Sequence, residues 1–71
     1  MTIAEAQELA RTFDRMFYVH IPEENAVLQV YPGGRSIAWP ERNIFLRRAH
    51  RDLDLVSQLI RRRNETPRTT A

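Results

Sequence analysis

Two histidines are the side chains of this chain best suited to acid–base chemistry. His50 is followed four residues later by Asp54, and on a helix that spacing can join a base to its orienting carboxylate or form half of a metal site. The same spacing describes an ordinary surface pair, which is the simpler interpretation. His20 lies in an alternating, strand-like segment and is expected to point away from the core. The sequence predicts no enzyme, no metal site and no cofactor. A pocket that holds both histidines would reopen the enzyme hypothesis.

A glycine-rich segment, Gly33-Gly34-Arg35-Ser36, has the composition of a nest of backbone N–H groups for an anion. It has neither the Walker nor the Rossmann spacing, and a plain hairpin turn accounts for both glycines. The chain has no cysteine, which excludes disulfides, thiolate metal sites and thiol nucleophiles. These observations favour binding over catalysis.

Charge is unevenly distributed along the chain. Residues 1–31 hold five acidic residues and two arginines, a net −3, whereas residues 32–71 hold nine arginines and four acidic residues, a net +5. All eleven basic residues are arginine, a usage typical of GC-rich coding sequences such as those of many bacteria and their phages. The uneven charge indicates either that the two halves pair with one another or that a basic face meets an anionic partner.

Nucleic acid is one partner that the arginine-rich second half suggests. Arg47 and Arg51 would lie on the outer face of a second helix, and Arg35 would lie in a turn. The remaining candidates for phosphate contacts form a run at the end of that helix: Arg61, Arg62 and Arg63. Asp54 interrupts the basic face, and cations complement a helix C-terminus in any case. Nucleic-acid binding is therefore the alternative hypothesis and not the preferred one.

The first element that must position these residues is a helix predicted over residues 2–17. Thr2 followed by Glu5 has the pattern of a capping box. Apolar residues then recur at helical spacing on one side: Ile3, Ala6, Leu9, Ala10, Phe13, Met16 and Phe17. We expect the helix to lay this stripe on the core.

Three short extended segments follow the first helix. They are predicted at residues 18–21, 26–31 and 35–39, with turns at 22–25 and 32–34. The segments are short and close together in sequence, so an antiparallel hairpin or meander is expected.

The glycine turn decides which side chains share a face of the sheet. A two-residue glycine loop would pair Val30 with Ile37. It would also pair Leu28 with Trp39, which gathers the apolar residues on one face. A three-residue loop would place Gln29 beside Ile37 and divide the apolar residues between the two faces. The shorter loop is therefore predicted.

A second helix is predicted from Pro40 to about Arg63, because proline suits the first turn of a helix and apolar periodicity follows it. Its core-facing stripe consists of Phe45, Leu46, Ala49, Leu53, Val56 and Ile60. Residues 64–71 have no apolar run and are predicted to form a disordered C-terminal tail. A single globular domain over residues 1–63 is expected.

The order α-β-β-β-α predicts a small α+β domain in which two helices pack on one face of a short antiparallel β-meander or hairpin. Seventy-one residues suffice for one domain with a small core, so association with another chain would add useful burial. No uncharged apolar run is long enough for a signal peptide or a membrane span. We therefore expect a cytoplasmic protein with no membrane partner.

Apolar side chains beyond those that the core needs favour protein binding. They lie beside the core stripe of the second helix and on the sheet face away from Leu28 and Val30. With two arginines at the rim, they form the predicted partner-binding set: Val27, Tyr31, Ala38, Ile44, Arg47, Arg51, Leu55 and Leu59. We expect a small regulator or inhibitor, of the kind that phages and mobile elements encode, which binds another, larger protein or forms a homodimer.

Overall fold

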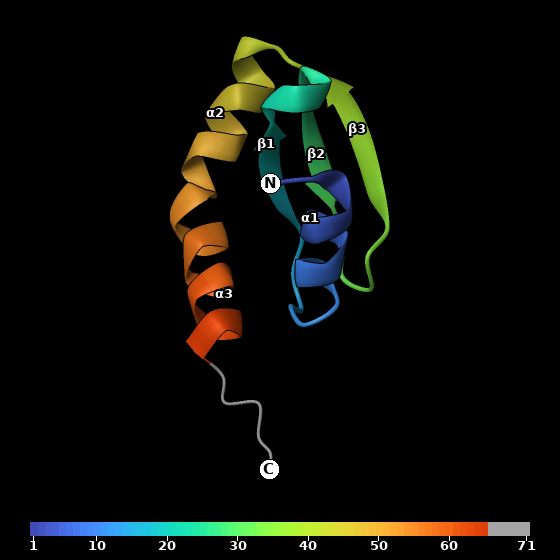
Figure 1. The fold of residues 1–71 in the computed structure, drawn as a ribbon. Helices are drawn as coiled ribbons and strands as arrows, with labels where there is room; N and C mark the ends of the chain where they lie inside the picture. Colours follow the sequence, from blue (N-terminus) through green and yellow to red (C-terminus); the bar gives the residue numbers. More distant parts are fainter. Residues whose placement is uncertain (66–71) are drawn as a thin grey trace.

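A three-stranded antiparallel sheet lies at the centre of the fold, and helices pack against it (Figure 1). The computed structural model describes residues 1–65. Its elements follow one another as α1 (Ile3–Ala10), β1 (Phe17–Ile21), a 3-10 helix (Pro22–Glu24), β2 (Ala26–Val30), β3 (Ser36–Pro40), α2 (Asn43–Arg51) and α3 (Leu53–Glu65). The strands are ordered β1-β2-β3 in space, which confirms the predicted α+β class and the β-meander.

Helix α1 begins as its sequence predicts. The N–H of Glu5 donates to Thr2 Oγ1 (3.1 Å) and the N–H of Thr2 donates to Glu5 Oε1 (2.8 Å), which completes the capping box. The backbone hydrogen bond from Thr2 is the main reason that the pKa of Glu5 lies below its ordinary value, because it favours the charged carboxylate. Local sequence alone therefore sets where this helix starts.

Helix α1 ends at Ala10 rather than near residue 17. The N–H of Gly33, in the β2–β3 turn, donates to the carbonyl of Ala10 (3.3 Å), an acceptor that a continued helix would use itself. Phe17 is fully buried as the first residue of β1. Strand pairing and core packing thus override the helical periodicity of residues 11–17.

The β2–β3 register corrects the predicted one. Gln29 pairs with Ile37, and the N–H of Tyr31 donates to the carbonyl of Arg35 (2.7 Å), so that the turn has three residues. Both glycines of this turn have positive φ values, which glycine adopts readily. The prediction of a two-residue loop assumed that one face of the sheet is buried. It was wrong because both faces are covered.

Different helices cover the two faces of the sheet. The larger core cluster joins one face, at Phe17, Val19, Ile21, Leu28 and Val30, to side chains of α1 and α3. On the other face Tyr18 and Val27 pack against Ala49 of α2, and Phe45 and Leu46 complete this second cluster. Two helices thus pack on one face of the meander, as predicted, and they are α1 and α3. The addition to the prediction is α2, which covers the other face.

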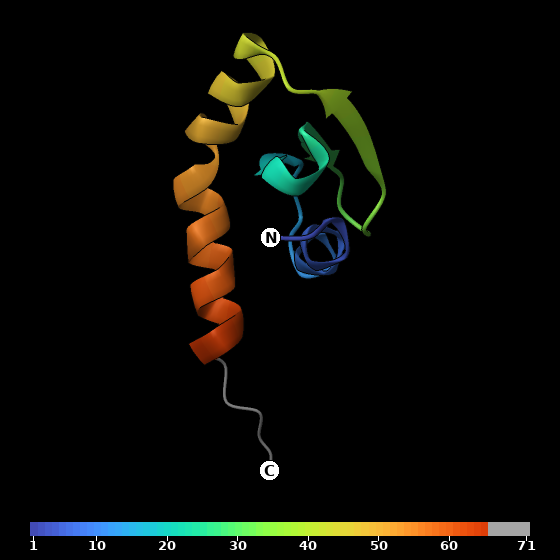
Figure 2. The same cartoon turned by 45° about the horizontal axis from the view of Figure 1, so that its top comes forward.

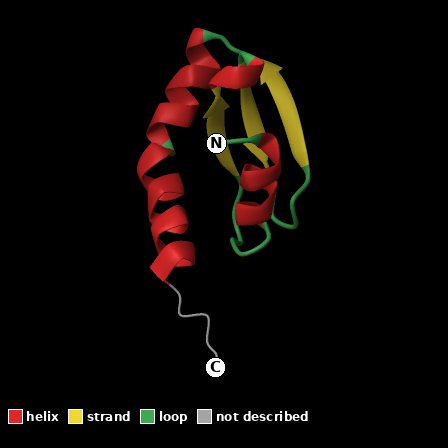
Figure 3. Ribbon diagram, in the orientation of Figure 1, coloured by secondary structure: helices red, strands yellow, loops and turns green. Residues whose placement is uncertain are grey.

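The chain crosses from one face to the other at Asp52, around the edge of β1. Asp52 separates α2 from α3 with φ −89° and ψ 0°, and Figure 3 shows the break in the helix. Its Oδ2 accepts the N–H of Tyr18 at 2.8 Å. The apolar stripe that predicted one continuous helix is thus divided, with Ala49 on one face and Val56 on the other.

Both ends of the C-terminal helical region differ from the prediction. Pro40 ends β3 instead of opening a helix, and the N–H of Glu41 donates to the carbonyl of Asn25 (3.2 Å). Helix α2 begins only at Asn43, and α3 continues past Arg63 to Glu65. The rest of the predicted disordered tail, residues 66–71, lies outside the described residues.

Candidate functional site

The two edge strands of the sheet, β1 and β3, have different surroundings. Figure 2 shows α2 and α3 along the β1 side, whereas β3 forms the opposite edge of the sheet. On the β1 side, Asp52 accepts the N–H of Tyr18, and Arg48 donates from Nη1 to Tyr18 Oη (2.8 Å). The guanidinium of Arg48 also lies 5.4 Å from the centre of the Tyr18 ring. The β1 edge is therefore blocked by side chains of the helical region.

The β3 edge presents backbone groups outward. Alternate residues of an antiparallel strand direct their N–H and C=O groups to the neighbouring strand, and the hydrogen bond from Tyr31 to Arg35 places the odd-numbered residues of β3 in that set. The N–H and C=O groups of Ser36 and Ala38 therefore point away from β2. Pro40 adds an outward carbonyl but has no N–H. No other strand among residues 1–65 lies beside this edge.

Apolar side chains accompany the open edge. Ile37 is 44% exposed, which makes it one of the largest apolar groups at the described surface. It borders a hollow of about 510 Å³ together with Tyr31, Arg35 and Ser36. Trp39 lies two residues after Ile37 in β3 and makes more contacts. Its ring stacks on Phe45 with centroids 4.9 Å apart, and its Nε1–H donates to Gln29 Oε1.

Two residues of the predicted partner-binding set are corrected by their burial. Val27 was placed on an open sheet face, but it is fully buried beneath α2, between Tyr18 and Ala49. Leu59 was placed beside the core stripe, but it is only 8% exposed and packs in the main cluster. Both errors have one cause, since the predicted single helix could cover only one face.

The other members of the set lie at or near the surface. Tyr31 and Leu55 are half-buried, and Leu55 packs against the main core. The remaining four are exposed: Ala38, Ile44, Arg47 and Arg51. The structure does not bring Tyr31 and Ala38 together, because Tyr31 follows β2 opposite Arg35 whereas Ala38 pairs with Leu28, which places the two side chains on opposite faces of the sheet. Sequence reasoning missed Ile37, which the three-residue turn would have placed on the outer face.

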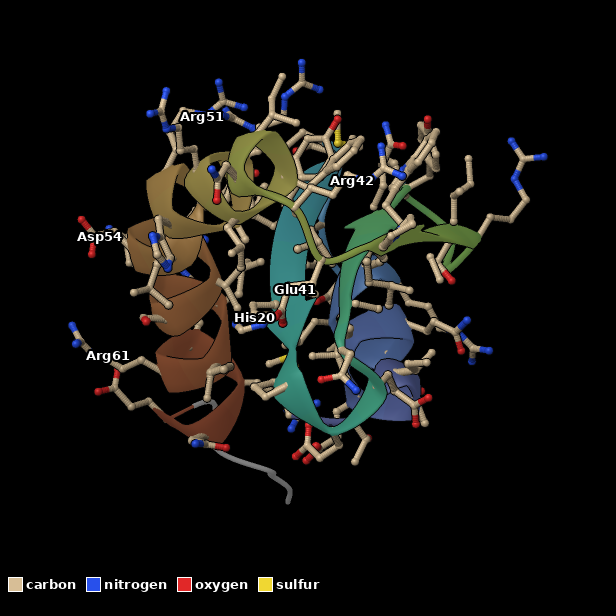
Figure 4. The ribbon with its side chains drawn as sticks, turned by 90° about the horizontal axis from the view of Figure 1, so that it is seen from above. His20, Glu41, Arg42, Arg51, Asp54 and Arg61 are labelled. Carbon is tan, nitrogen blue, oxygen red and sulfur yellow. The ribbon has the colours of Figure 1, made fainter. Side chains whose placement is uncertain are left out.

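The predicted phosphate-contacting arginines do not share one surface. Figure 4 shows Arg51 and Arg61 on different parts of the helical side, with Asp54 between them. Arg51 also lies 3.6 Å from an oxygen of Asp52. Arg35 is on the opposite side of the sheet, beside β3. The exposed acids and the separation of the arginines leave no continuous basic surface across these positions.

Both histidines line one groove of about 420 Å³ between β1 and the α2–α3 region. His20 Nε2 contacts Glu41 Oε2, each side chain is about one-third exposed, and Figure 4 shows the two pointing toward one another. His50 does not contact Asp54 within residues 1–65, because the break at Asp52 separates them. The expected surface pair is thus absent, and the condition set for considering catalysis, a pocket with both histidines, is met.

The groove has some of the parts that acid–base chemistry needs. A carboxylate that orients a histidine is a recurring arrangement, and Ser57 also lines the groove. Within residues 1–65, however, neither histidine is hydrogen-bonded to a serine, so an activated nucleophile is not formed. The same described residues contain no group of three or more His, Cys, Asp or Glu side chains placed to hold a metal ion.

Comparison with models of known families, with curated proteins and with solved structures finds no match for this chain. Across residues 1–65, every helix is too short or too polar to cross a membrane. The functional argument therefore depends on the geometry of the chain itself.

Proposed function

We propose that this protein is a small, non-enzymatic protein-binding module that accepts an extended segment of its partner along β3. The observation that carries this proposal is the contrast between the two sheet edges. Asp52 and Arg48 occupy the surroundings of β1, whereas Ser36 and Ala38 direct backbone donors and acceptors outward from β3.

An open edge strand is a template for another strand. Proteins that do not use such an edge commonly protect it with charges, a bulge or an early proline. Here the centre of β3 carries Ile37 and Ala38, and Pro40 stands only at its end. Main-chain hydrogen bonds would supply affinity, and the exposed Ile37 with the hollow beside Tyr31 would supply side-chain selectivity.

The test is affinity capture from lysate of a bacterial host with two variants of one residue. Ala38→Pro removes an outward N–H that β2 does not use, and proline is tolerated at such edge positions. Ala38→Val keeps the N–H and favours a strand. We expect wild type and Ala38→Val to retain the same partner, and Ala38→Pro to lose it while its circular dichroism is unchanged. Equal capture by a folded Ala38→Pro variant would contradict the proposal.

Nucleic acid remains the alternative partner, and the same capture distinguishes it. Arg47 and Arg51 are exposed on α2, and contacts to phosphate would make binding fall steeply as salt rises. Two results would together favour this alternative. Nuclease would abolish the capture, and a gel shift with nucleic acid would be lost in Arg47→Gln but not in Ala38→Pro.

The histidine groove supports acid–base chemistry as a second candidate function. Its supporting observation is the His20–Glu41 contact beside His50. A screen for hydrolysis by the purified protein tests it, with His20→Ala and His50→Ala as paired variants. Activity that both variants lose would support the candidate, and activity that neither changes would exclude the groove as its source.

A further inference from the structure

We propose that the extended segment bound along β3 carries an acidic side chain opposite Arg35 and an apolar side chain two residues away, opposite Ile37. This inference rests on the proposed function, because it states the chemistry of the partner at the same edge. The charges at the two ends of β3 and the hollow beside its first residues support it.

The turn end of β3 carries two arginines. Arg35 is exposed, and its guanidinium makes no hydrogen bond or ion pair within residues 1–65. Arg11, at the end of α1, lies beside the same turn, since a Cβ added to Gly34 would be 3.6 Å from Arg11 Nε. Arg11 is 3.9 Å from a carboxylate oxygen of Glu8, but both side chains are more than half exposed, and such a pair contributes little. Positive charge at this end is therefore available to a partner.

The opposite end of β3 is different. Arg35 and Glu41 are the residues that immediately flank the strand, and both are charged. The carboxylate of Glu41 contacts His20 of β1, so it is engaged within the chain (Figure 4). Charge complementarity thus acts at the turn end alone. It favours an acidic residue opposite Arg35 and requires no basic residue at the other end of the bound segment.

The backbone of the turn does not supply a site for an isolated anion. The N–H of Gly33 donates to the carbonyl of Ala10, and the N–H of Gly34 donates to the carbonyl of Tyr31. These two donors are therefore not available to form an anion nest. A carboxylate near Arg35 needs other contacts to hold it, and a segment paired along β3 would provide them through its backbone.

The hollow beside Tyr31 joins the backbone edge to one face of the sheet. It has a volume of about 510 Å³ and is lined by Tyr31, Arg35, Ser36 and Ile37. Tyr31 lies opposite Arg35, and side chains two residues apart share a face, so Tyr31, Arg35 and Ile37 are on the same face. Ser36 directs its N–H and C=O outward. An added strand can therefore engage the backbone and this face together.

The spacing of the two recognised side chains follows from the strand itself. Residues that face Arg35 and Ile37 across a paired strand stand two positions apart, because alternate side chains point to the same face. Ile37 is 44% exposed, so an apolar residue opposite it would bury surface that the single chain leaves in water. Tyrosine and arginine are also common among the residues that dominate binding energy.

Selection from a library of random peptides displayed on phage tests the proposal. Peptides retained by wild type should be enriched in aspartate or glutamate two positions from an apolar residue, and Ala38→Pro should not retain them. Arg35→Glu should instead select lysine or arginine at the acidic position. Arg47→Glu is the matched control, because it changes an exposed arginine of α2 by the same charge and should keep the wild-type preference.

Titration calorimetry with one selected peptide measures the contribution of the charge. Arg35→Gln should weaken binding by about two- to five-fold, as expected for a pair of opposite charges on adjacent strands. Arg35→Glu should weaken it further, because like charges then face one another, and a peptide with lysine in place of its acidic residue should restore binding to this variant. An equal loss in Arg47→Glu would indicate attraction between net charges and would overturn the proposal.

The two proposals fail in different ways. Selected peptides that Ala38→Pro loses, but that show no acidic preference or keep it in Arg35→Glu, would overturn the acidic segment and keep the protein-binding edge. A selection in which no retained peptide is lost by Ala38→Pro would overturn both.

Discussion

The carboxylate of Asp52 accepts the backbone N–H of Tyr18 across 34 positions of sequence, at 2.8 Å. This hydrogen bond joins the edge of the sheet to the one residue at which the helical region is interrupted. It satisfies a donor that an edge strand would otherwise leave without a protein acceptor. It also fixes the point at which the chain passes from one face of the sheet to the other, so Asp52 shapes the fold and blocks one edge.

Asp52→Ala should lower the free energy of unfolding by about 1–3 kcal/mol, because it leaves a part-buried N–H of Tyr18 without its acceptor. Urea unfolding followed by circular dichroism measures this change. Asp52→Asn is the matched control, since its amide oxygen can still accept the hydrogen bond and the loss should be smaller. Equal stability of wild type and Asp52→Ala would show that the contact does not stabilise the fold.

The same residue shows where sequence reasoning ends. The capping box of Thr2 and Glu5 was predicted correctly because both partners lie within one helical turn. The helix break at Asp52 was missed because apolar spacing runs through it without interruption, and the reason for the break lies in β1. Only the tertiary contact with Tyr18 distinguishes Asp52 from an ordinary helical aspartate.

The candidate site was predicted in part for a related reason. Ala38 was assigned to binding and lies on the open edge strand, and Tyr31 lies beside the turn before it, whereas Val27 was assigned to the same face and is buried by α2. The β2–β3 register was predicted wrongly because the apolar residues were expected to share one face of the sheet. A sheet with helices on both faces divides its apolar residues, and the alternation of side chains alone does not reveal how many faces are covered.

Gly33 should resist substitution even though space surrounds it. An added Cβ would meet nothing within 4 Å, but φ is +91°, a backbone conformation that costs an L side chain about 1–2 kcal/mol. Gly33→Ala should therefore lower the free energy of unfolding by that amount in urea denaturation. Gly33→Asn should cost less, because asparagine tolerates positive φ better. A neutral Gly33→Ala would show that the turn relaxes.

The capping box should make stability depend on pH. The pKa of Glu5 is lower in the folded chain than its ordinary value, so its contribution is present above the ordinary glutamate range and is lost as pH falls through the lowered value. Glu5→Gln removes this titration. The difference in unfolding free energy between wild type and Glu5→Gln should therefore shrink on acidification, and a difference that is constant with pH would contradict the assignment.

Thr2→Ala tests the other half of the box without changing charge. It removes the acceptor of the Glu5 N–H and should cost about 1 kcal/mol of stability. Thr2→Ser keeps a hydroxyl at the same position and should restore most of it. Thermal unfolding of the three chains at neutral pH provides the comparison. Equal losses for Thr2→Ala and Thr2→Ser would exclude the hydroxyl as the stabilising group.

Val27 and Ile37 provide a direct test of which register the sheet adopts. Val27 is fully buried beneath α2 and Ile37 is 44% exposed, so Val27→Ala should cost about 2 kcal/mol of unfolding free energy and Ile37→Ala about 0.5 kcal/mol or less. The register with a two-residue turn would reverse this order, because it buries Ile37 opposite Val30 and leaves Val27 outside. A larger loss for Ile37→Ala than for Val27→Ala would therefore refute the observed register and the open β3 edge with it.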